Sequence, residues 1–352
     1  MEVFRFGTIT ARRERRRRNP PGAALPGPDV LEGRALTSVG PGAGPGPLSS
    51  FPATVSVPSP GAPVPTSSGG VRASMNVVYT TIGGHAEHLD LYTPTGPKPP
   101  GGRPVVLALP GGGWRWVRRN DLGVTVSELA RYGYVVAVAD YAFASPKPGT
   151  HVWPTNFEDV RQAVRWLKIN AERYGIDPKK VAVWGESAGA HLGNLLGTDP
   201  DGPLIGLNGT PASQTPAGGV SARVQAVIDF YGPTDLPTLY TQAPKVQRFL
   251  DTFIGGPPSH YPAQYRDASP VSHVSADSPP FLIYQGTADT AVIPSQSAEL
   301  DQTLTKAGVR HTIEYFPGLP HGFRLKVGDV NLLPQVLAFL DSALNHPGSK
   351  TP

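Results

Sequence analysis

The stretch "KKVAVWGESAGAHLGNLLG", residues 179–197, sets a short apolar run directly before a helical pattern. Only the five residues Gly-Glu-Ser-Ala-Gly, 185–189, separate the two. Glycines on both sides of Ser187 remove side chains where strand and helix crowd each other, so the serine can take a strained conformation at the helix start. Its hydroxyl then points outward, near unpaired N–H groups and the positive end of the helix dipole. This context predicts a nucleophile elbow, although a glycine-rich turn with an incidental serine is the alternative.

The rest of the chain alternates short apolar runs with helical patterns. Several runs are almost continuously apolar, which is typical of strands buried on both faces. The predicted strands cover 76–82, 88–94, 104–110, 134–140, 180–185, 224–232, 280–286 and 311–316. Helices are predicted over 295–306, 332–344 and 156–175, the last with Asn156 as its N-cap and Gly175 as its end. The alternation predicts one α/β domain of the α/β-hydrolase type, a doubly wound, mostly parallel sheet of about eight strands with helices on both faces.

A serine hydroxyl needs an adjacent base, and that base needs a third group to orient it. His321 lies in the loop "FPGLPHGF", residues 316–323, after the last predicted strand. Asp289 follows the strand 280–286. The chain order Ser187, Asp289, His321 is that of α/β-hydrolases, and strand ends are where open α/β sheets gather their sites. We therefore predict these three residues as the catalytic group.

Other residues compete for two of these roles. His273, in "ASPVSHVS", is the rival base. Asp229 and Asp235 flank the end of the strand 224–232 and are the rival carboxylates, with helix capping or a turn as their structural alternative.

Acyl transfer also builds negative charge on a carbonyl oxygen, so it requires preorganised N–H donors. The loop "LALPGGGWRW", residues 107–116, follows a buried strand. Its glycines would let the N–H groups of Gly112 and Gly113 approach a substrate, together with that of Ala188. A plain flexible loop is the alternative. Phosphate binding is less well supported, because neither Gly-x-Gly-x-x-Gly nor a P-loop is completed.

Four side chains are candidate substrate contacts: Trp114, Trp116, Glu186 and Phe323. For the two tryptophans, ordinary packing beneath the loop is an equal alternative. Two long connections, 197–220 and 233–270, interrupt the rhythm of strands and helices, and the second is a candidate to line a pocket.

The positive charge of the chain is concentrated at its start. Residues 1–74 hold nine arginines and four acidic residues, a net +5, whereas the remainder carries a net −1. With 12 prolines and 11 glycines in its first 70 residues, this segment cannot bury enough apolar surface to offset the entropy of ordering. We predict a disordered extension over 1–74, a catalytic domain over 75–346 and a flexible tail over 347–352.

Several partners and compartments are disfavoured by the sequence. The arginine cluster at 12–18 could bind nucleic acid, but a solvated leader is the simpler interpretation, and no nucleic-acid partner is expected. No apolar stretch follows the basic start, so no secretory signal is predicted and a cytoplasmic location is expected. No run of 18 apolar residues suggests a membrane span, and the chain has no cysteine.

From about residue 77 to 344 the chain resembles the α/β-hydrolase superfamily, and within it bacterial carboxylesterases of the hormone-sensitive-lipase-like and feruloyl/acetyl-xylan-esterase-like groups. The matching motifs are "HLDLYTP" (88–94), "PGGGW" (110–114), "DYAFAS" (140–145), the segment 157–193, "GTADTAVIP" (286–294) and "LPHGF" (319–323). The resemblance implies a serine carboxylic-ester hydrolase that forms an acyl-enzyme, acts on a small-molecule ester, and needs no metal or cofactor.

Two features depart from that family pattern. Pro110 stands where the family usually has a histidine before the glycines. We expect this replacement to retune the oxyanion hole of the loop 107–116, hereafter the oxyanion loop, without abolishing it. The N-terminal region is too rich in proline and glycine for a helical cap, so an open site for short-chain or aryl esters is expected. Cleavage of amides, as in formamidases and peptidases, and a catalytically silent binding protein remain as alternatives.

Overall fold

The structure is a computed structural model that describes residues 69–82, 85–116, 119–144, 152–206, 211–212 and 219–346. All of the described residues belong to one compact unit. The predictions for the arginine-rich extension up to residue 68 and for the tail 347–352 lie outside the described residues.

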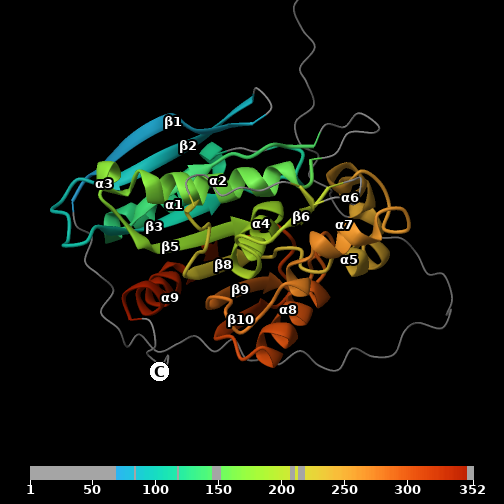
Figure 1. The fold of residues 1–352 in the computed structure, drawn as a ribbon. Helices are drawn as coiled ribbons and strands as arrows, with labels where there is room; N and C mark the ends of the chain where they lie inside the picture. Colours follow the sequence, from blue (N-terminus) through green and yellow to red (C-terminus); the bar gives the residue numbers. More distant parts are fainter. Residues whose placement is uncertain are drawn as a thin grey trace, which may run out of the picture. The chain divides into compact units, whose positions relative to one another are not determined.

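An eight-stranded sheet forms the centre of the described domain, in the order β1-β2-β4-β3-β5-β8-β9-β10. Figure 1 labels seven of these strands, which run in this order from β1 at the top to β10 at the bottom; β4 is not labelled. The strands are β1 (Val71–Ile82), β2 (His85–Pro94), β3 (Arg103–Leu109), β4 (Val135–Ala139), β5 (Ile176–Glu186), β8 (Ala226–Phe230), β9 (Phe281–Gly286) and β10 (His311–Phe316). Two short hairpins lie outside this sheet, β6 (Leu204–Ile205) with β7 (Pro211–Ala212) and β11 (Lys326–Val327) with β12 (Val330–Asn331).

The sheet is mostly parallel, which confirms the predicted fold class. Only β1 with β2 and β2 with β4 pair antiparallel; the strands from β4 to β10 pair in parallel. β1 begins at Val71, ahead of the expected domain start at Met75. Antiparallel pairing orders this segment, because Val71 lies opposite Pro94 of β2 and its ladder hydrogen bonds do not depend on an apolar pattern.

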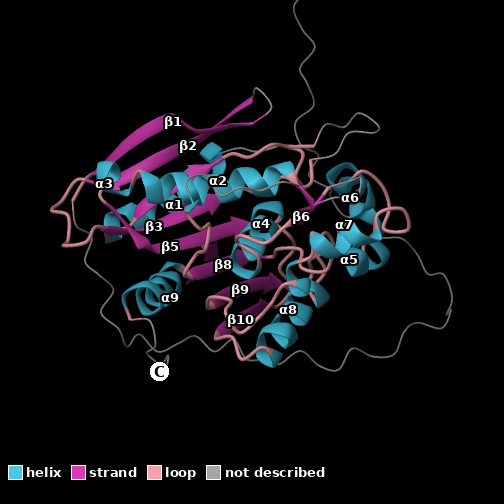
Figure 2. Ribbon diagram, viewed as in Figure 1, coloured by secondary structure: helices cyan, strands magenta, loops and turns pink. Residues whose placement is uncertain are grey.

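Helices connect the strands and cover both faces of the sheet (Figure 2). They are α1 (Arg119–Val126), η1 (Ser127–Tyr132), α2 (Thr155–Ile169), α3 (Ala171–Tyr174), α4 (Ala188–Thr198), α5 (Leu236–Gln242), η3 (Pro244–Val246), α6 (Gln247–Ile254), α7 (Pro262–Asp267), η4 (Pro270–Ser272), α8 (Ser295–Lys306) and α9 (Leu333–Asn345). The expected N-cap at Asn156 is wrong. This residue lies inside α2, whose N-cap is Pro154, and its buried side chain makes no capping hydrogen bond. The predicted single helix is also divided, since α2 ends at Ile169 and Gly175 ends α3 in a left-handed conformation.

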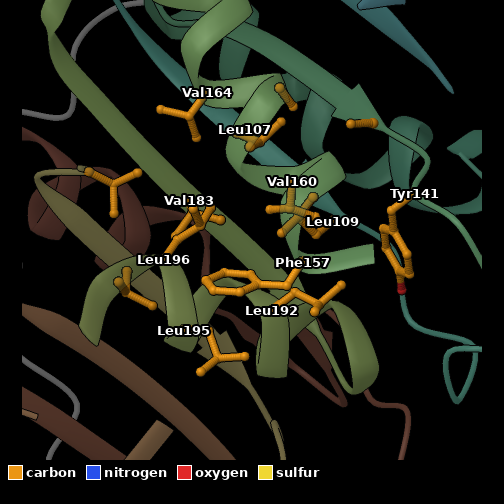
Figure 3. Packing of buried hydrophobic residues seen from close by; sticks show 14 of the residues in the cluster. Leu107, Leu109, Tyr141, Phe157, Val160, Val164, Val183, Leu192, Leu195 and Leu196 are labelled. Carbon is orange, nitrogen blue, oxygen red and sulfur yellow. The ribbon is translucent and has the colours of Figure 1, made fainter. Parts of the chain in front are cut away.

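The two faces of the sheet pack into separate apolar clusters because successive strand residues point to opposite sides. Leu107 and Val183 pack with α2, α4 and α8, whereas Val106 and Ala182 pack with α1 and α9. Figure 3 shows the first cluster, with Phe157 and Val160 of α2 among the leucines of β3 and α4. The helix α4 is buried along its whole length, so its first residue is held firmly against the sheet.

Strand register aligns the ends from which the site is built. Glu186, the last residue of β5, lies level with Phe230 of β8, which in turn lies level with Tyr284 of β9. Phe316, the last residue of β10, lies level with Gly286. Because these strands are parallel, the loops that follow them leave the sheet at one edge.

Candidate active site

Ser187 is the single residue between β5 and α4, and its backbone is strained as the elbow predicts. Its φ is 53° and its ψ is −119°, a conformation that residues other than glycine rarely adopt. Two hydrogen bonds hold it there. The N–H of Ser187 donates to the carbonyl of Phe230 at 2.9 Å, and its carbonyl accepts from the N–H of His191 at 2.9 Å.

The two glycines of the elbow are required by close approach of the backbone. A Cβ atom added at Gly185 would overlap the backbone of Ala190 at the start of α4. One added at Gly189 would overlap the carbonyl of Leu109, the last residue of β3. The helix can therefore sit directly on the sheet only where these two positions lack a side chain.

The structure brings together the three residues predicted from separate motifs. Nε2 of His321 lies 2.9 Å from Oγ of Ser187, and Nδ1 of His321 lies 2.6 Å from Oδ2 of Asp289. A carboxylate can only accept, so Nδ1 carries the proton and Nε2 is free to accept the serine proton. A hydroxyl, an imidazole and a carboxylate are thus hydrogen-bonded in series.

Asp289 is held in one orientation by the turn that follows β9. Its Oδ1 accepts from the N–H groups of Ala291 at 2.8 Å and Val292 at 2.9 Å. The residue is only 3% exposed. Since Oδ1 is saturated by the turn, Oδ2 is the oxygen left to face His321.

The rival residues named from the sequence have structural partners instead. Nε2 of His273 bonds to the carbonyl of Asp267 at 2.8 Å. Asp235 is the N-cap of α5 and accepts from the N–H of Thr238 at 3.2 Å. Asp229 is fully buried and accepts from the side chain of Asn194 and from the N–H of Gly232. Burial raises the pKa of Asp229 to about 6, against the lowering effect of these two bonds.

The loop after β3 lies directly beside Ser187. A Cβ atom added at Gly111 would lie 3.2 Å from the Cβ of Ser187. Gly112 and Gly113 have φ values of 140° and 59°, which favour glycine. Among the described residues no hydrogen bond is seen from the N–H groups of these two glycines. Ala188 is the first residue of α4, so its N–H has no acceptor within the helix.

The four candidate substrate contacts are placed differently from one another. Trp114 is 3% exposed and stacks on Phe253 beneath the loop, which is the packing role that the sequence left open. Trp116 is 52% exposed and meets Phe249 of α6 edge-on, with ring centroids 6.2 Å apart. Phe323 packs against buried aromatic residues of β9 and β10, and its ring centroid lies 5.3 Å from that of Phe316. Of the three aromatic side chains, only that of Trp116 presents a largely open surface.

Glu186, the fourth candidate, carries a carboxyl group that is mostly withdrawn from solvent. Its Oε1 atom finds no hydrogen-bond donor among the described residues. Burial raises its pKa to about 7, and the positive charges of Arg324 and His321 oppose that rise.

Sequence reasoning missed Tyr231, which supports His321 and its loop. Tyr231 follows β8, has a φ of 48°, and meets the ring of His321 with centroids 4.7 Å apart. Its hydroxyl donates to the carbonyl of Phe323 at 2.8 Å, within the histidine loop. A residue directly after a central strand end is a usable signal of proximity, but the apolar pattern of 224–232 predicts that Tyr231 is part of the strand.

The second long connection reaches the oxyanion loop, as its candidate role as a pocket wall requires. A Cβ atom added at Gly113 would lie 2.5 Å from Cδ1 of Phe249, so the ring occupies the space that a side chain at this position would need.

Within the described ranges no group of three His, Asp or Glu side chains is arranged to hold a metal ion. No helix in the same ranges is both long and apolar enough to cross a membrane.

Comparison with protein families gives one match of more than half the chain. The model of the BD-FAE family matches residues 89–304. This range contains Ser187 and Asp289 but ends before His321.

Two of the curated relatives that the chain resembles come from Mycobacterium tuberculosis. The protein named "Probable carboxylic ester hydrolase LipM" is 34% identical over 218 residues, which cover 61% of this chain and 48% of LipM. "Esterase LipC" is 34% identical over 232 residues, 64% of this chain and 54% of LipC. The chain thus spans about half the length of the curated relatives that it matches.

Among solved structures, esterase 2 of Thermogutta terrifontis is similar over most of its length. The form phosphorylated by paraoxon aligns with a TM-score of 0.60 and 26% identity, covering 80% of this chain and 96% of the esterase. A propionate-bound form of the same esterase aligns with a TM-score of 0.60 and 25% identity, covering 81% and 96%.

Proposed function

The chain belongs to the BD-FAE family and has the α/β-hydrolase fold, and from that premise we propose that it is a serine carboxylic-ester hydrolase. The observation that carries the proposal is the series of hydrogen bonds from Ser187 to His321 at 2.9 Å and from His321 to Asp289 at 2.6 Å. Esterase names among the relatives, and the phosphorylation of the Thermogutta esterase by paraoxon, support a covalent nucleophile in the same fold.

The proposed reaction begins with attack on the ester carbonyl. Oγ of Ser187 forms a bond to the carbonyl carbon while Nε2 of His321 takes the serine proton. Asp289 holds the imidazole in the required tautomer and stabilises the imidazolium that forms. The negative charge moves to the former carbonyl oxygen, where the N–H groups of Gly112, Gly113 and Ala188 are the proposed donors.

Collapse of the tetrahedral intermediate breaks the bond to the alcohol. The alcohol leaves with the proton from His321, so the acyl group remains on Ser187 as an ester. Water then repeats the sequence, giving its proton to His321 and releasing the carboxylic acid and the free serine.

The substrate side of the proposal is a short-chain or aryl ester. Trp116, at the end of the oxyanion loop, is 52% exposed and offers an apolar surface that suits a flat or short apolar group. The propionate bound to the Thermogutta esterase shows a short acyl acid in that relative, and the same size class is proposed here.

A panel of p-nitrophenyl esters of increasing acyl length, with p-nitroanilides of the same acids, tests the reaction on the full chain. The esters are expected to be cleaved much faster than the anilides. Ser187→Ala is expected to lower kcat/KM by at least about 10³-fold, because removing a triad serine leaves only binding and the oxyanion donors. Ser342→Ala, on α9, is the matched control and should retain wild-type rates.

Covalent labelling checks the same assignment independently of turnover. A fluorophosphonate probe should attach to Ser187, and the adduct should be absent from Ser187→Ala. Equal turnover by Ser187→Ala and the wild type would refute the proposal, as would labelling of a different serine. Faster cleavage of the anilides than of the esters would assign the protein to amide hydrolysis instead.

A further inference from the structure

His191 lies one turn after Ser187 on α4 and makes two hydrogen bonds in the interior. Its side chain is fully buried. Nε2 lies 2.7 Å from the carbonyl oxygen of Ala268, directly after α7. Nδ1 lies 3.3 Å from the indole Nε1 of Trp114, in the oxyanion loop. His191, on α4, thus bonds to the oxyanion loop and to the residue after α7, two segments that are far apart in the sequence.

The chemistry of these partners fixes the form of the ring. A carbonyl oxygen only accepts, so Nε2 of His191 must carry a hydrogen. An indole N–H only donates, so Nδ1 must present its lone pair. The ring is therefore neutral and held in a single tautomer. Burial lowers the pKa of His191 to about 4, against the raising effect of the Ala268 carbonyl, which agrees with a neutral ring.

The surroundings of the ring are aromatic. Trp114 and Phe253 both meet His191 edge-on, with centroids 5.2 Å and 5.4 Å away. The groups that contact the ring from the oxyanion loop, from α6 and from the residue after α7 carry no charge. An apolar environment strengthens a hydrogen bond, so the indole bond holds the two side chains together more firmly than it would in water.

Trp114 needs such an anchor because its backbone is strained. Its φ of 56° is unusual for a residue with a side chain. Three contacts hold it: the bond to His191, the stack on Phe253 with centroids 4.4 Å apart, and the bond from the N–H of Ala144 to its carbonyl at 2.6 Å. Of these, only the indole bond comes from α4, the helix that begins directly after Ser187.

We propose that His191 is a positioning residue for the oxyanion loop, which sets the N–H groups of Gly112 and Gly113 relative to Ser187 by holding the indole of Trp114. Gly113 is bonded covalently to Trp114, so a shift of the indole moves the amides that face the developing oxyanion. The bond to Ala268 fixes the opposite side of the ring against the second long connection. The inference rests on the proposed ester hydrolysis, because it assigns a part of the same site.

Loss of this anchor should appear in the transition state and not in substrate binding. Oxyanion donors act on charge that develops during the reaction, so their displacement lowers kcat more than it raises KM. A displacement of the order of 1 Å can cost about a hundredfold in rate. We expect kcat to fall by about tenfold to a hundredfold when the indole bond is removed, with KM changed by less than about threefold.

Four single substitutions on the full chain separate the bond from the packing. Trp114→Phe deletes the indole N–H and keeps a ring to stack on Phe253. His191→Gln keeps a donor near Nε2 but misplaces the acceptor, whereas His191→Asn places its amide oxygen near the Nδ1 position. Trp153→Phe is the matched control, because Trp153 is also buried beside Phe253 and its indole N–H finds no hydrogen-bond partner in the described part of the chain.

The measurements are kcat and KM on one p-nitrophenyl ester, and Ki for a trifluoromethyl ketone with the same acyl group, whose hemiketal mimics the oxyanion. Trp114→Phe and His191→Gln should lower kcat and raise Ki in parallel. His191→Asn should restore most of the rate, and Trp153→Phe should stay at wild type. The double variant of Trp114→Phe with His191→Gln should be no slower than the slower single variant, because both remove one bond.

Wild-type kcat and Ki in Trp114→Phe would overturn the inference, as would an equal loss in Trp153→Phe. Additive losses in the double variant would do so too. If the His191 variants fail to fold, Trp114→Phe still decides the question. An inactive Ser187→Ala together with fully active Trp114→Phe refutes this inference alone, whereas an active Ser187→Ala refutes the ester hydrolysis and this inference with it.

Discussion

The ring of Tyr231 meets the ring of His321 edge-on, with centroids 4.7 Å apart and planes at 64°. Tyr231 is 2% exposed, follows β8 directly, and holds a φ of 48°. Its hydroxyl donates to the carbonyl of Phe323, two residues beyond His321. The tyrosine thus touches both the imidazole and the loop that presents it, so it restricts where Nε2 can point.

Tyr231→Phe should weaken that restriction while keeping the ring contact. The carbonyl of Phe323 loses its donor, which costs about 1–3 kcal/mol of stability if the group stays buried. The histidine loop is then freer to move, so kcat should fall by about tenfold, as geometric displacement of a catalytic group does. The measurements are kcat on a p-nitrophenyl ester and the free energy of unfolding in urea.

Tyr284→Phe is the control for this change. Tyr284 is also buried and donates its hydroxyl to the side chain of Gln335 at 2.7 Å, away from His321. It should lose a similar amount of stability and keep its kcat. Equal rates for Tyr231→Phe and the wild type would show that the bond to Phe323 does not position the histidine.

Asp289→Asn should remove most of the activity without disturbing the turn. Two backbone N–H groups point at Oδ1, so the amide oxygen of asparagine takes that place and its NH₂ group faces Nδ1 of His321. The imidazole must then carry its hydrogen on Nε2, where it cannot accept from Ser187. A wrong tautomer of this kind costs about 10⁴-fold in kcat in serine proteases.

The rival carboxylate Asp235 supplies the control for Asp289→Asn. Asparagine caps a helix about as well as aspartate, so Asp235→Asn should leave α5 and the rate near wild type. Should the two substitutions reverse, with Asp235→Asn inactive and Asp289→Asn active, the acid of the triad is misassigned.

Much of the fold and of the candidate site could be predicted from the sequence because its signals are local. Apolar runs of strand length identified all eight strands of the main sheet, although only approximately at their ends. Ser187, Asp289 and His321 could be named because each follows a strand in a glycine-rich segment. Their meeting was inferred from topology, since parallel strands end at the same edge.

The remaining features depend on contacts that no local pattern encodes. The positive φ of Tyr231 and Trp114 belongs to residues with large side chains, so the residue type gives no sign of it. The burial of Trp114 depends on Phe253, from an insertion far along the chain. Asn156 looked like an N-cap because it precedes an apolar pattern, yet the structure starts the helix before it and buries its side chain.

The oxyanion loop should tolerate a side chain at Gly113 better than at Gly112. An added Cβ at Gly112 meets the backbone carbonyl of Trp116, which cannot move without moving the loop. At Gly113 the clash is with the ring of Phe249, and the φ of 59° costs an alanine only about 1–2 kcal/mol. Gly112→Ala should therefore lower kcat by about 10²-fold or more, the loss typical of one oxyanion donor.

Combining each glycine variant with Phe249→Ala distinguishes a steric clash from the loss of an oxyanion N–H donor. Gly113→Ala should be impaired alone and should recover part of its kcat when Phe249→Ala removes the opposing ring. Phe249→Ala does not relieve the clash at Gly112, so it should not rescue Gly112→Ala. Equal recovery of both glycine variants, or of neither, would contradict this arrangement of the loop and α6.

Glu186 makes the stability of the fold depend on pH in a defined direction. Burial raises the pKa of its carboxyl from 4.5 to about 7 in the folded chain, so the folded state binds more protons than the unfolded state between these values. Stability contributed by the protonated group is fully present below pH 4.5 and is lost as the pH rises to about 7. At about 1.4 kcal/mol per unit of pKa, the loss is roughly 3 kcal/mol.

Glu186→Gln lacks this titration, so its advantage in free energy of unfolding over the wild type should grow from pH 4.5 to pH 8 in urea titrations. Glu172→Gln, on the exposed side of α3, gives the baseline for replacing a surface glutamate. A difference between Glu186→Gln and the wild type that stays constant over this range would mean that the Glu186 carboxyl is solvated and charged in the folded protein.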